Sequence, residues 1–272
     1  MRRFLIIAAC LAALSSAACG GGEPKTALGY TADAKRAYDE AMEEFTAHNW
    51  IDAVNKMREV KRKYSYSKYA RLAELRIADA DYEQEKFADA IREYRQFVHD
   101  HRSDNDEVSY ARSRIAEAEY SQITDGFLLA AGEERDQAVV FDAYKELRGY
   151  LHDYPDARQS AHMRDLLAVV TARLIRHELY VARFYLSRDN YDAAIARVQY
   201  ALRNYSMGAD VVAKAGESLE PEALLLLGET YLKMHKWAEA REAFVTITKR
   251  FSDSGLILAA SGFLDWMHQR GV

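Results

Sequence analysis

The sequence predicts an all-α chain of about five stacked helix-turn-helix units followed by a C-terminal capping helix. Composition is the first reason: the 272 residues include three prolines, and residues 30–125 contain neither Gly nor Pro, which favours long helices. A frame that occurs five times is the second. In each copy an aromatic or apolar residue stands three positions before a small anchor, and further apolar or aromatic residues mostly follow four, seven and eleven positions after it. These offsets share one face of a helix, so each copy predicts an amphipathic helix that ends in a turn. The anchors are Ala53, Ala90, Ala143, Ala194 and Ala240.

A second set of small residues gives the third reason. Twelve positions before four of the anchors stand Ala41, Ala78, Ala182 and Gly228. Two helices can cross at short distance only where no long side chain separates them, so these residues predict tight hairpins. The pattern resembles the tetratricopeptide repeat, a helix-turn-helix unit of about 34 residues. The resemblance implies a tetratricopeptide-repeat solenoid, in which wider anchor spacing after Ala90 requires longer helices or inserted loops.

The first two units are compact. Apolar residues predict a helix over 32–47, a turn at His48 and Asn49, and a partner helix over 50–64, which gives a unit of about 31–65. The second unit, about 67–102, has helices on either side of a bend at Phe87.

The later units are longer. The third, about 107–155, pairs helices over 107–121 and 136–153 across a crossover at 121–137, which is either a plain loop or part of a binding face. The fourth, about 157–206, begins with one long helix over 158–186. After a linker at 207–219, Pro221 suits the first turn of the fifth unit, about 217–252. A helix over 256–269, within the segment 254–270, is expected to cap the array.

The N-terminus has the layout of a secretory signal. Two arginines precede an apolar run and then small residues, so residues 1–18 are expected to be removed. The sequence from Ser16 to Cys19 resembles the bacterial lipobox, which implies lipidation of Cys19; an ordinary signal with a chance cysteine is the alternative. Residues 19–30 then read as the lipidated cysteine and a flexible tether. In such lipoproteins the absence of Asp after the cysteine implies the outer membrane, on its periplasmic face.

No catalytic, cofactor or metal motif is present. None of the eight histidines falls in an HExxH motif, and no phosphate-binding glycine motif follows a predicted strand. The net charge of −5 leaves no surplus of cations for nucleic acid. We therefore expect a protein that is not an enzyme and carries no cofactor or metal.

Three stretches extend the resemblance beyond a generic repeat. They are SKYARLAELRIADADYEQEKFADAIREYRQFVHDH, RDQAVVFDAYKELRGYLHDYPDA and RHELYVARFYLSRDNYDAAIARV. With the lipobox, these resemble the BamD family, lipoproteins of the outer-membrane β-barrel assembly machinery. The resemblance implies a scaffold that binds a periplasmic (POTRA) domain of the barrel-forming subunit, other lipoproteins of the complex, and unfolded outer-membrane proteins that await insertion.

Two sets of site residues follow from the resemblance. Arg183, Arg188 and Arg197 are candidates for the partner interface, although each could instead be a surface arginine paired with a helical acid. The inner face of the first helices is the candidate substrate groove, unless its residues form core between units. The groove candidates are Tyr38, Met42, Phe45, Leu72, Leu75 and Tyr82.

Two other functions remain open at this stage. One is another periplasmic repeat lipoprotein that coordinates cell-envelope or cell-division proteins. The other is an enzyme or enzyme regulator, against which the missing catalytic set counts.

Overall fold

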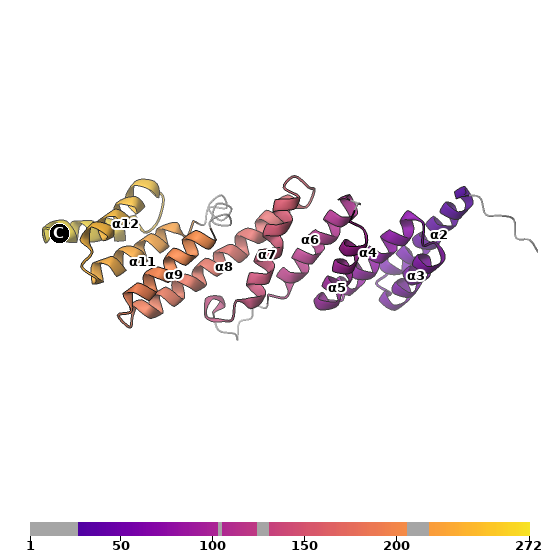
Figure 1. The fold of residues 1–272 in the computed structure, drawn as a ribbon, viewed down its shortest axis with the longest axis horizontal. Coiled ribbons are helices and arrows are strands. Elements are labelled where there is room, and N and C mark those ends of the chain that lie inside the picture. The colour runs from indigo at the N-terminus through magenta and orange to yellow at the C-terminus, as the bar shows by residue number, and fades with distance from the viewer. Residues whose placement is uncertain (1–26, 103–104, 124–130, 206–217) are drawn as a thin grey trace, which may run out of the picture. The chain divides into compact units, whose positions relative to one another are not determined.

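The computed structural model describes residues 27–102, 105–123, 131–205 and 218–272. Over these residues the chain is helical and has no strand, which confirms the predicted all-α class (Figure 1). The helices begin and end close to the predicted positions. They are α2 (Ala27–Thr46), α3 (Trp50–Lys63), α4 (Lys68–Glu83), α5 (Phe87–Asp100), α6 (Asn105–Ser121), α7 (Ala138–Asp153), α8 (Ser160–Leu186), α9 (Tyr191–Asn204), α11 (Glu220–Lys233), α12 (Trp237–Arg250) and α13 (Ile257–Gln269), with a 3₁₀ turn η1 (Gly132–Glu134).

The described residues form two compact units, the first ending at Ala80 and the second beginning at Asp81. In the first, α2 and α3 make an antiparallel hairpin, since Tyr30 packs edge-on against Tyr64 at one end and Phe45 against Trp50 at the other. The first part of α4 completes its core. That core consists of Ala41, Met57, Val60, Ala73 and Ile77.

In the second unit each helix from α5 to α9 packs on the next, and α9, α11, α12 and α13 continue the series. Alternate helices also meet, because α8 contacts both α6 and α11. The large core centres on α7, α8 and α9 and includes Tyr150, Leu167, Leu179 and Val198. The long helix predicted over 158–186 is α8, and it contacts the helices on both sides of it as expected.

The predicted frame accounts for the packing. All five alanine anchors have no exposed surface, and the residues four and seven positions after them are buried as well. The upstream residues Ala41, Ala78 and Ala182 are also at most 1% exposed. The anchors and the upstream residues are therefore buried small side chains, as the close helix approach predicted from the sequence requires.

Four hairpin turns share a backbone feature that was not predicted from the sequence. His48, Glu85, Asp189 and His235 have φ values of 57–60°, in the left-handed region that usually takes glycine. In each turn the next residue donates its N–H to a carbonyl five residues back, as Lys86 does to Asp81 at 2.9 Å. This bond and the left-handed residue end the first helix of each hairpin in the same way.

Parts of two predictions change. Helix α2 begins at Ala27, so the last four residues of the expected tether are helical. Residues 132–134 of the predicted crossover form η1, whose Glu133 carbonyl lies 2.7 Å from Nδ1 of His177 on α8. The signal segment, Cys19, residues 124–130 of the crossover and most of the 207–219 linker lie outside the described residues.

Candidate functional site

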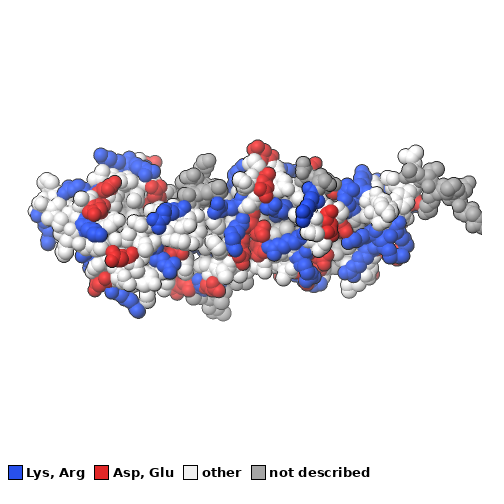
Figure 2. All heavy atoms as spheres, viewed as in Figure 1, with Lys and Arg blue, Asp and Glu red and all other residues white. Residues whose placement is uncertain are grey.

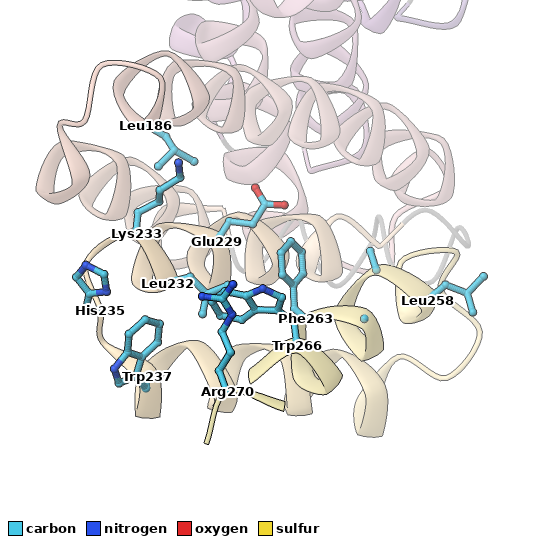
Figure 3. Close-up of a pocket in the computed structure, with 12 residues that line it drawn as sticks. Leu186, Glu229, Leu232, Lys233, His235, Trp237, Leu258, Phe263, Trp266 and Arg270 are labelled. Atoms are coloured by element: carbon cyan, nitrogen blue, oxygen red, sulfur yellow. The ribbon is translucent and has the colours of Figure 1, made fainter. Parts of the chain in front are cut away.

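A groove between the last helices is a concave site of the second unit. It encloses about 1030 Å³ and is lined from α11, α12 and α13, with Leu186 contributed by the last turn of α8 (Figure 3). Its apolar lining includes Trp237, Phe263 and Trp266. The two tryptophan rings lie 6.5 Å apart at a tilt of 46°. Helix α13 packs on α12 as expected of a terminal helix, yet it leaves this apolar groove open.

The groove has a cationic rim. Lys233, His235 and Arg270 line it beside a single acid, Glu229. The guanidinium of Arg270 stands 4.4 Å from the centre of the Trp266 ring. Burial raises the pKa of the Glu229 carboxyl, and nearby Arg183 partly opposes that shift. An apolar floor with excess positive charge at its edge favours an apolar ligand segment that has acidic neighbours.

Two of the three arginines expected at a partner interface, Arg183 and Arg188, lie near the end of α8 that contributes Leu186 to this groove. Arg183 forms an ion pair with Glu222, which joins α8 to α11. The Arg188 guanidinium lies 4.0 Å from the centre of the Phe184 ring. Leu186 stands between the two in sequence and lines the groove, so both arginines belong to the same end of α8 as the apolar wall.

Arg197 has a partner within the chain. Its Nη1 donates to Oε2 of Glu178 at 3.2 Å, across the α8–α9 hairpin, and the Glu178 side chain is only 8% exposed. Burial works against the charged guanidinium, but the hydrogen bond to Glu178 gives a net rise in the pKa of Arg197. The guanidinium thus compensates a buried carboxylate, while 44% of the Arg197 side chain stays exposed.

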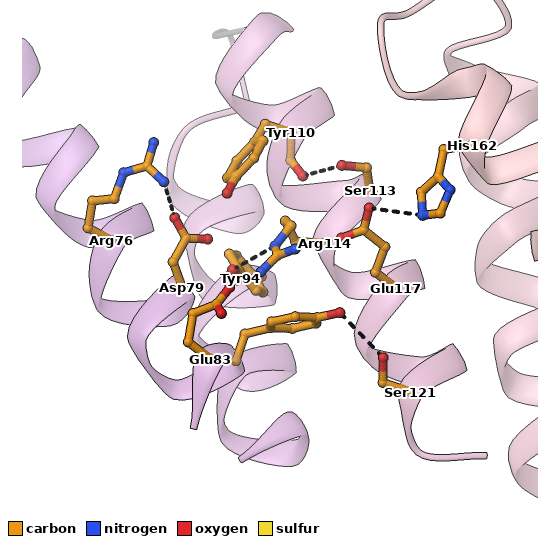
Figure 4. A network of polar contacts seen from close by, with 11 residues as sticks. Arg76, Asp79, Glu83, Tyr94, Tyr110, Ser113, Arg114, Glu117, Ser121 and His162 are labelled. Atoms are coloured by element: carbon orange, nitrogen blue, oxygen red, sulfur yellow. Dashed lines mark hydrogen bonds and ion pairs between the residues drawn. The ribbon is translucent and has the colours of Figure 1, made fainter. Parts of the chain in front are cut away.

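A second polar cluster surrounds Arg114 on α6 (Figure 4). Its guanidinium lies 3.7 Å from the centre of the Tyr82 ring, from the end of α4. It donates to Glu117 at 2.7 Å and approaches Glu83 and the Tyr94 hydroxyl at 3.4 Å. Three helices are therefore held together by one side chain that is 16% exposed. We interpret the cluster as a structural clamp because its charges are already paired.

In the described part of the chain no group of three or more His, Cys, Asp and Glu side chains could hold a metal ion. None of the described helices is both long and apolar enough to cross a membrane.

Comparison with known proteins identifies the family. The family model described as "YfiO: Outer membrane lipoprotein" matches residues 31–235, which is most of the chain. This chain belongs to the YfiO family. A tetratricopeptide-repeat model also matches residues 222–254, over α11 and α12, as the repeat frame predicted.

Several relatives of the YfiO-family chain share one name. This chain is 29% identical over 241 residues to "Outer membrane protein assembly factor BamD" of Caulobacter vibrioides. The alignment covers 88% of this chain and 73% of the relative. The protein of the same name from Neisseria meningitidis serogroup A is 26% identical over 210 residues, covering 75% and 78%. That of Vibrio cholerae is 23% identical over 170 residues, covering 62% and 70%. The BamD resemblance drawn from the sequence is confirmed.

The six residues proposed for the substrate groove differ in how far they are exposed in the structure. Leu75 is 2% exposed and belongs to the core, so it cannot line an open surface. Tyr82 is half-buried under Arg114 and shares a 3.3 Å hydrogen bond with Ser121. The other four are partly exposed in the first unit, where Tyr38 and Met42 pack beside the core and Phe45 meets Trp50. Those four are Tyr38, Met42, Phe45 and Leu72.

The groove of Figure 3 was missed at the sequence level. Trp237 was assigned to the frame and α13 to a cap, so neither was considered as a binding surface. The sequence did show Leu258 and Trp266 within the expected terminal helix, and in the structure their exposed fractions are 84% and 38%. A capping helix that keeps large apolar residues outward indicates an interaction surface.

Proposed function

We propose that the chain is a non-enzymatic scaffold of outer-membrane protein assembly, anchored to the outer membrane and working on its periplasmic face. The observation that carries the proposal is the family match over residues 31–235 together with relatives that are named assembly factors. The repeat fold supports it, because stacked hairpins offer extended binding surfaces without a catalytic centre. Lipidation of Cys19 would provide the anchor.

The second unit carries the proposed docking surface for the barrel-forming subunit. Its elements are the apolar groove and the Arg183 and Arg188 side chains at the end of α8. Tryptophan and arginine dominate the binding energy of many protein interfaces, especially around an apolar pocket. Arg197 contributes its exposed part, while its bond to Glu178 fixes its orientation.

The first unit carries the proposed contact with unfolded outer-membrane proteins. Tyr38, Met42, Phe45 and Leu72 offer partly exposed apolar surface on α2 and α4, which suits an apolar or aromatic peptide segment. A photo-reactive phenylalanine analogue at Phe45 should cross-link to C-terminal peptides of barrel proteins. The same analogue at Leu75 should not, because that position is buried.

Affinity purification of the full chain from detergent-solubilised outer membranes tests the docking surface. The variant Arg188→Glu with Trp266→Ala should recover about tenfold less barrel-forming subunit, since it removes two expected interface anchors. Arg158→Glu, at an exposed site before α8, is the charge control and should recover as much as wild type. Circular dichroism should show the same helix content in all three proteins.

Two outcomes would overturn different parts of the proposal. Undiminished recovery by the Arg188 and Trp266 variant would reject this surface but leave the scaffold role standing. Absence of any barrel-assembly partner from the wild-type eluate would reject the scaffold role. Cell-division or envelope proteins in that eluate would then support the alternative repeat lipoprotein.

A further inference from the structure

One end of the first unit concentrates positive charge in an acidic protein. Between residues 56 and 71 the chain carries seven Lys or Arg residues and a single acid, Glu59, although the net charge of the whole chain is −5. In Figure 2, Lys and Arg side chains gather over the region that α3 occupies in Figure 1. This segment therefore departs from the electrostatics of the rest of the molecule.

The solvent face of α3 presents these cations. Ala53, Met57 and Val60 are buried, so Arg58 and Arg62, one turn apart, lie on the opposite face and are exposed. Acids offset part of the charge. Glu59 contacts Arg62 at 3.9 Å and Lys63 at 2.7 Å, and Glu74 contacts Lys61 at 2.5 Å.

Two large apolar side chains project at the same end. Tyr66, in the turn between α3 and α4, is 96% exposed, and Leu28, in the first turn of α2, is 84% exposed. Tyr30 follows Leu28 by two residues, and Tyr64 precedes Tyr66 by two. The Tyr30 and Tyr64 rings are in edge contact, with their centroids 5.4 Å apart. The hairpin thus brings the start of α2 and the α3–α4 turn together, and Lys63 and Lys68 lie within three residues of Tyr66 in the sequence.

This combination matches the requirements of a membrane surface. Cationic side chains are drawn to anionic lipid headgroups within a Debye length. Exposed aromatic and aliphatic side chains among them insert at the headgroup level.

The chain geometry places the surface where a membrane would be. Cys19 is eight residues from Ala27, and eight extended residues span no more than about 30 Å. If Cys19 is acylated, the first turn of α2 is held within that distance of the bilayer. The cationic surface adjoins that turn.

We propose that the surface formed by Arg58, Arg62, Lys63, Tyr66, Lys68 and Leu28 binds anionic lipid headgroups of the membrane to which the chain is anchored. The contact orients the first unit against the bilayer. This inference rests on the membrane-anchored scaffold proposed above. It adds a lipid-binding surface that is separate from the protein-docking groove on α11–α13.

Vesicle co-sedimentation tests the lipid contact without the anchor. The chain from residue 19 onward with Cys19→Ala keeps every residue that the structure describes. Its partition into phosphatidylglycerol-containing vesicles should exceed that into phosphatidylcholine vesicles about tenfold or more, and added salt should reduce the difference. Arg58→Glu with Arg62→Glu should abolish the preference. Arg158→Glu with Lys249→Glu makes the same charge change on the second unit and should preserve it.

Equal partition into both kinds of vesicle would overturn the proposal. So would equal losses in the two doubly reversed variants, because net charge rather than this surface would then govern binding. Since this experiment does not use the lipid anchor, failure of lipidation at Cys19 would leave its result unchanged. The two ideas can therefore fail separately.

A second measurement tests orientation on the anchored protein. A fluorophore on Ser65→Cys in the acylated chain should be quenched by a bilayer-resident quencher in phosphatidylglycerol vesicles. A fluorophore on Ala47→Cys, in the exposed α2–α3 turn at the other end of the same hairpin, should be quenched at least several-fold less. Equal quenching at the two positions would contradict the proposed orientation.

Discussion

Gly228 on α11 and Phe244 on α12 lie so close that a Cβ added to the glycine would stand 2.4 Å from Cε1 of the ring. The ring cannot withdraw easily, because it stacks on Phe263 with centroids 4.8 Å apart. The other hairpins with an aligned small residue have alanine at this position. The last hairpin therefore requires glycine where its neighbours tolerate a methyl group.

Gly228→Ala should destabilise the second unit. Overpacking a core typically costs about 1–3 kcal/mol, and the better helix propensity of alanine returns about 1 kcal/mol, so a net loss of up to about 2 kcal/mol is expected in urea unfolding. Gly262→Ala is the control, since its Cβ would meet nothing within 4 Å. That variant should gain up to about 1 kcal/mol. Equal shifts in the two variants would contradict the close-approach argument.

The left-handed turn residues lead to a second prediction. Glu85 has φ of 60°, a conformation that costs an L-residue roughly 1–2 kcal/mol and glycine almost nothing. Glu85→Gly should therefore stabilise the protein, by up to about 1 kcal/mol once the entropy of glycine is counted. Glu85→Val should destabilise it, because a β-branched side chain is poorly tolerated there. Urea midpoints for the pair should shift in opposite directions.

The Arg197 and Glu178 pair should show strong coupling. Arg197→Met leaves a buried carboxylate without its partner and should cost about 2 kcal/mol at neutral pH, the cost of an unpaired buried charge being partly relieved by solvent. Glu178→Gln in the same chain should recover much of that loss. A double-mutant cycle should give a coupling free energy of about 1 kcal/mol or more. Additive effects would mean that the ion pair is dispensable.

Because the pKa of Glu229 is raised, the stability of the folded chain should fall as the pH rises. Burial raises the pKa of its carboxyl above the ordinary value of 4.5, so the folded chain holds this proton more tightly than the unfolded chain. The stabilisation is complete below pH 4.5 and is lost as the pH rises through the raised pKa. Glu229→Gln should therefore be more stable than wild type at pH 7 and equal to it below pH 4.5. A constant difference across that range in thermal unfolding would contradict this assignment.

The fold could be predicted in detail because its determinants are local. A helix at 50–64 was expected and α3 spans Trp50–Lys63, since the spacing of Ala53, Met57 and Val60 is itself the packing rule. The turn conformation at Glu85 could not be predicted, because nothing in that residue type favours a positive φ. It is imposed by the hairpin that it closes.

The candidate sites were harder to predict from the sequence than the fold, for a different reason. Leu75 could be assigned to a groove or to core by periodicity alone, and only the packing around α4 shows that it is buried. The Arg197 and Glu178 contact joins residues nineteen positions apart on different helices, beyond any helical spacing rule. The groove on α13 depends on the angle at which that helix meets α12, which side-chain pattern does not specify.

The central claim is a role in building the outer membrane, and depletion of the chain in its own bacterium tests it most directly. The measurement is the amount of folded barrel proteins in the outer membrane, read from their heat-modifiable mobility in gel electrophoresis as the chain is depleted. The account predicts that folded barrels decline together while unfolded forms accumulate, and that the intact chain restores them. Undiminished folded barrels in cells that lack the chain would contradict it.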